Sequence, residues 1–129
     1  MPVAKSLTVM IVDDQMSMRG LTRQALQTMG IGRILEAKDG KDAIRLMSEG
    51  PIHLVLSDWN MPDMDGLTLL RTLRRHPVTK NIGFIMLTGN TSSENVRQAI
   101  EAGVNNYIAK PFDMITFKKK IEAVIGVLN

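Results

Sequence analysis

Short apolar runs alternate along the chain with longer segments in which apolar residues recur every three or four positions. The runs are short enough to be single strands, and most are nearly continuous, as in strands covered on both faces. They read LTVMIV (7–12), RILEA (33–37), HLVLS (53–57), GFIML (83–87) and NYIA (106–109). The pattern predicts five parallel strands.

The segments between the runs are expected to be helices, because their apolar residues lie at i, i+3 or i+4 spacing. Asp65, just before GLTLL, is expected to cap the third helix, and Thr91 with Glu94 has the spacing of a capping box for the fourth. The apolar stripes are Leu21, Ala25 and Met29; Ala43, Ile44 and Met47; Leu69, Leu70 and Leu73; Val96, Ala99 and Ile100; and Phe117, Ile121, Val124, Ile125 and Leu128.

Strands that alternate with helices in this way predict an α/β fold, an open and doubly wound (βα)5 sandwich with right-handed crossovers. The length of 129 residues suits one domain covering 1–129. The fifth helical segment runs to the last residue. We therefore expect neither a linker nor an output domain.

Composition and charge narrow the range of possible functions. The chain has no cysteine, which excludes disulfides, cysteine-ligated zinc and thiol catalysis and fits a reducing compartment. No apolar run is long enough to span a membrane, so we expect a cytoplasmic protein. The net charge is +3, but the basic residues are scattered, and the run 118–120 is expected to be the solvated face of a helix. Binding to nucleic acid is not favoured.

Chemically versatile side chains follow four of the predicted strands directly. In an open parallel sheet the carboxyl ends of the strands lie at one edge, where ligands bind. We therefore expect a shared pocket at that edge. Its members are Asp13 and Asp14 after the first strand, Asp58 after the third, Thr88 at the end of the fourth, and Lys110 after the fifth.

Such a pocket suits a divalent cation and phosphoryl chemistry. Neighbouring carboxylates repel one another, and an all-oxygen set of ligands favours Mg²⁺. A carboxylate beside Mg²⁺ can attack a phosphoryl group and form an acyl phosphate. Lys110 and Thr88 could then stabilise the phosphoryl oxygens. Taken singly, Asp14, Thr88 and Lys110 could each be structural or solvated, but their joint placement indicates a functional site.

The stretch VLSDWNMPDMDG (55–66) offers three aspartates as the nucleophile. Asp58 is preferred because it alone ends a strand. Asp63 follows the turn-forming Pro62, and Asp65 has the position of a helix cap.

In combination, VDD, DWNMPDMDG, TG and KPF resemble the receiver domain of bacterial two-component response regulators. The run WNMP, the single domain and Tyr107 before Lys110 are most similar to the CheY-like chemotaxis regulators in that family. The resemblance covers nearly the whole chain. It implies a flavodoxin-like five-stranded parallel sheet with the strand order 2-1-3-4-5.

The resemblance also implies a ligand set for Mg²⁺. Asp14 and Asp58 would be direct ligands together with the backbone carbonyl of Asn60, and Asp13 would act largely through water. Asp58 would accept the phosphoryl group from a CheA-like sensor histidine kinase. Lys110 would bind the oxygens of the product, as would the hydroxyl of Thr88.

A conformational switch is implied as well. Thr88 would move toward the phosphoryl group and Tyr107 would turn inward, which would reshape the surface of the fourth helix, fifth strand and fifth helix. That face would bind a FliM-like flagellar motor switch protein, and a phosphatase could end the signal. The protein would be a monomer, with a cis bond between Lys110 and Pro111.

Several positions depart from this family pattern or tune it. Gln15 stands where an aromatic residue can occur, and Gly89 replaces a more usual alanine. Asn60 and Asn90 occupy the positions at which the family tunes hydrolysis of the acyl phosphate. The basic run 118–120 on the output face would favour an acidic partner segment.

Other interpretations remain open. A receiver could serve as a phosphate sink or a phosphorelay intermediate rather than as a motor effector. DMDGL (63–67) superficially matches the D-x-D signature of phosphatases that use an aspartyl phosphate, but their first aspartate should end a strand. A calcium-binding loop fails because Pro62 would stand at a ligand position.

Overall fold

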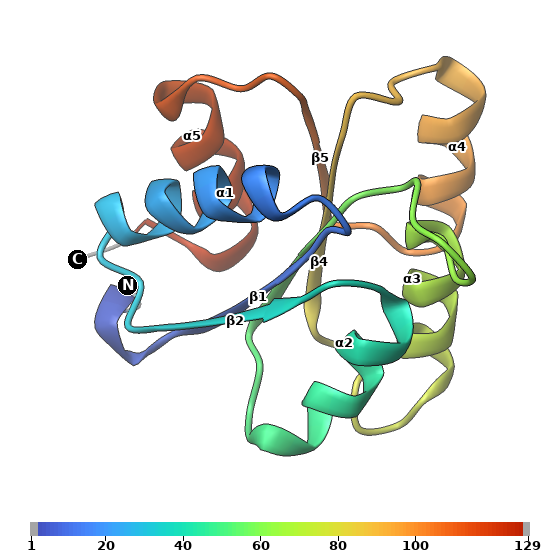
Figure 1. The fold of residues 1–129 in the computed structure, drawn as a ribbon, viewed down its shortest axis with the longest axis horizontal. Coiled ribbons are helices and arrows are strands. Elements are labelled where there is room, and N and C mark those ends of the chain that lie inside the picture. Colours follow the sequence, from blue (N-terminus) through green and yellow to red (C-terminus); the bar gives the residue numbers. More distant parts are fainter. Residues whose placement is uncertain (1–2, 128–129) are drawn as a thin grey trace.

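Five parallel strands form one sheet in the order β2-β1-β3-β4-β5. The computed structural model describes residues 3–127 (Figure 1). The strands are β1 (Thr8–Val12), β2 (Arg33–Ala37), β3 (Leu54–Ser57), β4 (Gly83–Thr88) and β5 (Asn106–Ala109). This confirms the predicted flavodoxin-like strand order. All four strand pairs are parallel.

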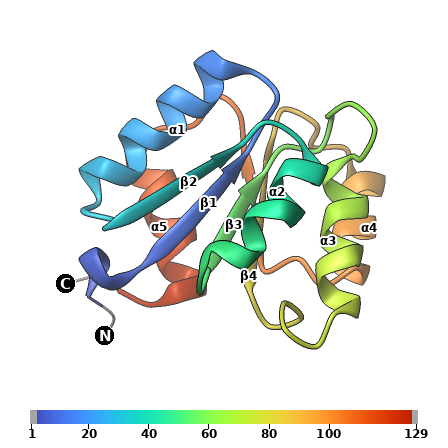
Figure 2. The ribbon, with the colours of Figure 1, turned by 60° about the horizontal axis from the view of Figure 1, so that its bottom comes forward.

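Helices cover both faces of the sheet (Figures 1 and 2). They are α1 (Met16–Thr28), α2 (Gly40–Leu46), α3 (Gly66–Arg75), α4 (Ser93–Glu101) and α5 (Met114–Ile125), with short 3-10 helices η1 (Ala4–Ser6) and η2 (Met47–Glu49). α1 and α5 pack on one face, and α2, α3 and α4 pack on the other. The doubly wound arrangement is therefore as predicted.

The central strands are apolar because both of their faces are covered. In β1, Val9 and Ile11 join the core beneath α1 and α5, whereas Met10 and Val12 join the core on the opposite face. The edge strand β2 is more exposed and places Glu36 beside α1.

Side-chain caps at two helices test the sequence predictions. The Asp65 carboxylate accepts the Thr68 N–H at 2.8 Å, which confirms the predicted cap of α3. The predicted capping box from Thr91 to Glu94 is wrong. The Ser92 hydroxyl accepts the Asn95 N–H at 3.2 Å instead, and α4 begins one residue later than expected. The serine provides the cap and leaves Thr91 in the preceding loop.

Of the predicted stripe residues in the described part of the chain, half are buried and five are half-buried, but three are exposed. Leu21 is 56% exposed, Ile44 38% and Ile100 64%. Each lies at the margin of its helix stripe, and the arc of a helix that touches the sheet is narrower than the arc that periodicity selects. The expected stripe residue Leu128 lies outside the described residues. Among residues 3–127, no helix is long and apolar enough to cross a membrane.

Candidate functional site

Three carboxylates meet at the carboxyl edge of the sheet, at the ends of two neighbouring strands. Val12 and Ser57 are paired in the register of β1 and β3, and Asp13 and Asp58 follow them directly. Asp13, Asp14 and Asp58 each offer an oxygen within 4.8 Å of the others. The structure therefore brings together the three aspartates that the sequence selected.

Lys110 connects two of these carboxylates. Its Nζ atom lies 2.7 Å from Oδ2 of Asp13 and 3.1 Å from Oδ2 of Asp58. All three side chains are largely buried. Charge-assisted hydrogen bonds of this length offset part of the repulsion between the carboxylates.

The two aspartates after β1 have different environments. Asp13 is buried, and its carboxylate accepts both the Gln15 N–H at 2.9 Å and the Lys110 ammonium. Asp14 is exposed, and within residues 3–127 its carboxylate has no hydrogen-bond or ion-pair partner. Asp14 is therefore available to a cation. The all-oxygen donor set fits Mg²⁺, which binds to one or two carboxylates and keeps several waters.

Backbone contacts fix Asp58 at the end of β3. Its Oδ1 atom accepts the Trp59 N–H at 2.6 Å, which leaves Oδ2 beside Lys110. Gly66 at the start of α3 donates its N–H to the Trp59 carbonyl at 2.8 Å. A Cβ atom on Gly66 would lie 2.2 Å from the Asp58 carbonyl oxygen. Glycine is thus needed where α3 approaches the site, and the sequence analysis missed this role.

Thr88 lies at the same edge, at the end of β4. Its side chain is buried, and its hydroxyl accepts the Asn90 N–H at 3.2 Å. Within the described residues, Thr88 makes no hydrogen bond to the three carboxylates. Its carbonyl accepts the Lys110 N–H at 3.0 Å, which ties the ends of β4 and β5 together.

Tyr107 is half-buried in β5, and its hydroxyl donates to the Asn90 carbonyl. Burial raises the pKa of the phenol, and the negative charge of Asp58 raises that pKa further. The residue therefore contacts the β4–α4 loop and lies within electrostatic range of Asp58. The bond between Lys110 and Pro111 is cis, as expected.

Asp63 and Asp65 do not belong to the acidic site. Asp63 is exposed in the loop after β3 with a positive φ of 67°, and Asp65 caps α3. Neither residue ends a strand, which removes the geometric basis of the phosphatase interpretation.

The basic run on α5 is only partly solvated. Lys118 and Lys119 are exposed, as expected, but the Lys120 ammonium donates to the Tyr107 carbonyl at 2.6 Å. The interpretation of the whole run as a solvated face therefore needs this correction. Lys120 ties α5 to β5 because it lies on the side of α5 that faces the strand.

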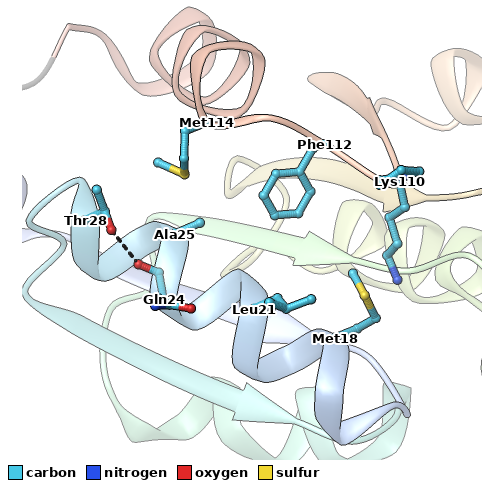
Figure 3. A pocket seen from close by; sticks show the side chains of 9 residues that line it. Met18, Leu21, Gln24, Ala25, Thr28, Lys110, Phe112 and Met114 are labelled. Atoms are coloured by element: carbon cyan, nitrogen blue, oxygen red, sulfur yellow. Dashed lines mark hydrogen bonds between the residues drawn. The ribbon is translucent and has the colours of Figure 1, made fainter.

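An apolar groove of ≈ 570 Å³ extends from Lys110 between α1 and the β5–α5 segment (Figure 3). Lys110 and Met18 lie at one end and Thr28 at the other. The lining residues are Met18, Leu21, Gln24, Ala25, Thr28, Lys110, Pro111, Phe112 and Met114. Leu21, which periodicity assigned to the core, lines this groove instead. The sequence did contain a signal for this groove, because Met18 and Leu21 are three residues apart and lie on the same face of α1.

Comparison with known proteins agrees with this geometry. Residues 9–122 match the response regulator receiver domain family. The chain is 44% identical over 129 residues to a probable chemotaxis protein CheY of Rhizobium etli, with all of both chains covered. It is 36% identical over 120 residues to chemotaxis protein CheY-3 of Vibrio cholerae, which covers 93% of this chain and 92% of that protein.

Solved structures show the same likeness. Chemotaxis protein CheY4 of Vibrio cholerae is 30% identical with a TM-score of 0.85, over 92% of this chain and 98% of that one. The receiver domain of the sensor histidine kinase PA1611 of Pseudomonas aeruginosa, solved with a magnesium ion in its active site cleft, is 25% identical with a TM-score of 0.84. That match covers 94% of this chain and 98% of that domain.

A five-stranded doubly wound sheet with three carboxylates and a lysine at its carboxyl edge defines a receiver-type signalling domain. The chain belongs to the response regulator receiver domain family. Within that family it is CheY-like over its whole length.

Proposed function

We propose that this protein is a Mg²⁺-dependent phosphoacceptor in which Asp58 receives a phosphoryl group from the phosphohistidine of a sensor histidine kinase. The observation that carries the proposal is the Lys110 ammonium held between Asp13 and Asp58, beside the exposed and unpaired carboxylate of Asp14. The magnesium-containing receiver domain of Pseudomonas aeruginosa supports the choice of ion.

In the proposed transfer, an Asp58 carboxylate oxygen forms a bond to phosphorus while the bond between phosphorus and the histidine nitrogen breaks. The electron pair stays on the imidazole nitrogen, which takes up a proton. Because Oδ1 of Asp58 is held by the Trp59 N–H, Oδ2 is the oxygen that attacks. Lys110 already lies 3.1 Å from that atom and can follow the new phosphoryl oxygens.

Asp14, Asp58 and the backbone carbonyl of Asn60 would bind Mg²⁺, with Asp13 acting largely through water. When bound, the ion would neutralise charge on the phosphoryl oxygens. Both carboxylate oxygens of Asp13 already accept a hydrogen bond, one from the Gln15 N–H and one from the Lys110 ammonium. These contacts leave Asp13 less available than Asp14 as a direct ligand and support its indirect role.

The groove beside Lys110 supports docking of the kinase. The Lys110 ammonium lies at one end of it, so a helix seated between α1 and Phe112 would bring its phosphohistidine close to Asp58. The lining is largely apolar and includes two methionines, which adapt readily to a partner surface.

The output surface is proposed to be the face formed by α4, β5 and α5, with a flagellar motor switch protein as its target. Tyr107 connects this face to the site because its hydroxyl binds the Asn90 carbonyl two residues after Thr88. Exposed Ile100 on α4 and the hollow between Ile100 and Tyr107 offer an apolar anchor point. The relatives that are named as chemotaxis proteins favour this target and a cytoplasmic location.

Intact mass after incubation with acetyl phosphate tests the chemical part of the proposal. The native protein should gain one phosphoryl group only when Mg²⁺ is present. Asp58→Asn should abolish the gain, and Asp63→Asn, a matched control in the same loop, should not. Uptake that survives in Asp58→Asn contradicts the proposal.

The partner is tested separately by a pull-down with a flagellar motor switch protein, with and without phosphorylation. Binding that rises on phosphorylation supports the motor effector. Phosphorylation without any change in binding supports a sink or a relay.

A further inference from the structure

We infer that Arg19 is a positioning residue for the metal site, in that it fixes the β1–α1 loop by holding the backbone carbonyl of Asp13. This inference rests on the proposed Mg²⁺ site. Arg19 is the fourth residue of α1, and its Nη1 atom donates to the Asp13 carbonyl oxygen at 2.7 Å. Its side chain is only 15% exposed.

The start of α1 needs such a contact because it lacks the usual cap. Gln15 occupies the cap position without a side-chain hydrogen bond, and the first turn of the helix contains no acidic residue. Backbone N–H groups of the β1–α1 loop instead donate the hydrogen bonds that hold it in place. Asp13 donates its N–H to the Ala37 carbonyl at 3.1 Å, and the Gln15 N–H binds the Asp13 carboxylate. The Arg19 guanidinium completes this set at the Asp13 carbonyl.

Fixing Asp13 also fixes Asp14, the next residue in the chain. Within residues 3–127, the Asp14 side chain has no partner of its own, so the backbone on either side of it determines where its carboxylate lies. A loose loop would let Asp14 leave the position that lies within 4.8 Å of the other carboxylates. Residues that orient metal ligands in this way affect metal affinity strongly, although they do not touch the metal.

Glu36 on β2 holds Arg19 in place. Arg19 Nε lies 3.3 Å from one Glu36 carboxylate oxygen, and Arg23 Nη1 lies 3.1 Å from the other. A guanidinium can bind a carboxylate and a carbonyl at once because its donors are arranged in a rigid fork, and a lysine ammonium cannot reproduce that geometry. Arg23 shares Glu36 but donates to the Ile34 carbonyl rather than to the loop.

This arrangement gives a test with a matched control. Arg19→Lys keeps the charge but removes the fork, and Arg23→Lys makes the same change on the same helix with the same acidic partner. The probe is Mn²⁺, with the free ion measured by electron paramagnetic resonance and then displaced by Mg²⁺. We expect Arg19→Lys to weaken binding of both ions about tenfold, whereas Arg23→Lys changes it less than about twofold.

Two further measurements separate positioning from general destabilisation. Urea unfolding without metal shows whether both variants are folded, and phosphoryl uptake in Arg19→Lys should return to the native rate at saturating Mg²⁺. Native affinity in Arg19→Lys, or equal weakening in the two variants, overturns the inference. If the native protein itself binds neither ion, the proposed Mg²⁺ site has failed and the inference fails with it.

Discussion

The Nζ atom of Lys110 lies 3.1 Å from Oδ2 of Asp58, although the two residues are 52 positions apart in the sequence. The sheet order explains the contact, because β3 and β5 flank β4 and all three strands end at the same edge. The ammonium therefore meets the proposed nucleophile before any phosphoryl group arrives. Lys110 should therefore affect both the metal affinity of the unphosphorylated carboxylates and the rate of phosphoryl transfer.

Lys110→Met should change metal binding and phosphorylation in opposite directions. Loss of the positive charge should tighten Mg²⁺ binding by at least about fivefold, because two unit charges about 4 Å apart in water interact by roughly 1 kcal/mol and Mg²⁺ carries twice the unit charge. Phosphoryl uptake should slow by about a hundredfold, because a preorganised cation at the transferring oxygens is lost. Metal titration and timed intact-mass measurements check the two effects. If the variant loses both metal binding and phosphoryl uptake, urea unfolding shows whether it is still folded. A folded variant that binds Mg²⁺ more weakly contradicts the prediction.

Tyr107 is the only tyrosine in the chain, so its phenol can be titrated by ultraviolet absorbance without overlap from others. Burial first and the Asp58 charge second raise its pKa in the folded protein. The stability that the neutral phenol contributes is complete below the ordinary tyrosine pKa of about 10 and is lost as the pH rises through the higher folded pKa.

We therefore expect a titration midpoint above about 10 in the folded protein and close to 10 in urea. Asp58→Asn should lower the folded midpoint without removing the whole shift, because burial is the larger cause. An identical midpoint in the folded and unfolded chains contradicts the described environment of Tyr107.

The acidic cluster could be predicted from the sequence because the carboxyl ends of parallel strands lie at one edge of the sheet. A residue that directly follows a strand must therefore lie at that edge. Asp13, Asp58 and Lys110 follow this rule. Helix stripes were less reliable. Periodicity selects a face but does not show how far the sheet covers it, so Leu21 and Ile100 were assigned to a core that they do not enter.

The residues that support the site were not predictable in the same way. Arg19 acts through a backbone carbonyl six residues earlier, and its sequence context is that of any exposed arginine on a helix. The role of Gly66 depends on how closely α3 approaches Asp58. Both roles arise from packing between elements, about which a single sequence carries little local signal.

Asp65 should contribute to stability and not to phosphorylation. Asp65→Ala removes the cap on α3 and should lower the free energy of unfolding in urea by about 1 kcal/mol. Asp65→Asn retains a side-chain oxygen that can accept the Thr68 N–H, so its stability should stay within about 0.5 kcal/mol of native. Both variants should still take up one phosphoryl group. Loss of uptake in the stable asparagine variant would reopen the phosphatase interpretation of DMDGL.

Two glycines near the site should respond differently to alanine. A Cβ atom on Gly66 would lie 2.2 Å from the Asp58 carbonyl oxygen and 3.0 Å from the Met86 sulfur, so α3 must move away from β3. Gly89 is exposed, and nothing lies within 4 Å of the Cβ atom that alanine would add. The pair therefore compares the same added methyl group at a tight and an open position.

Gly66→Ala should lower the free energy of unfolding by about 1–3 kcal/mol, the usual cost of overpacking, and Gly89→Ala should change it by less than about 0.5 kcal/mol. Because displacement of α3 also pulls on the Asp58 backbone, Gly66→Ala should slow phosphoryl uptake even under conditions in which it is fully folded. Urea unfolding and timed intact-mass measurements on both variants check this. Native stability in Gly66→Ala would mean that α3 can retreat without cost and that its approach does not fix the position of Asp58.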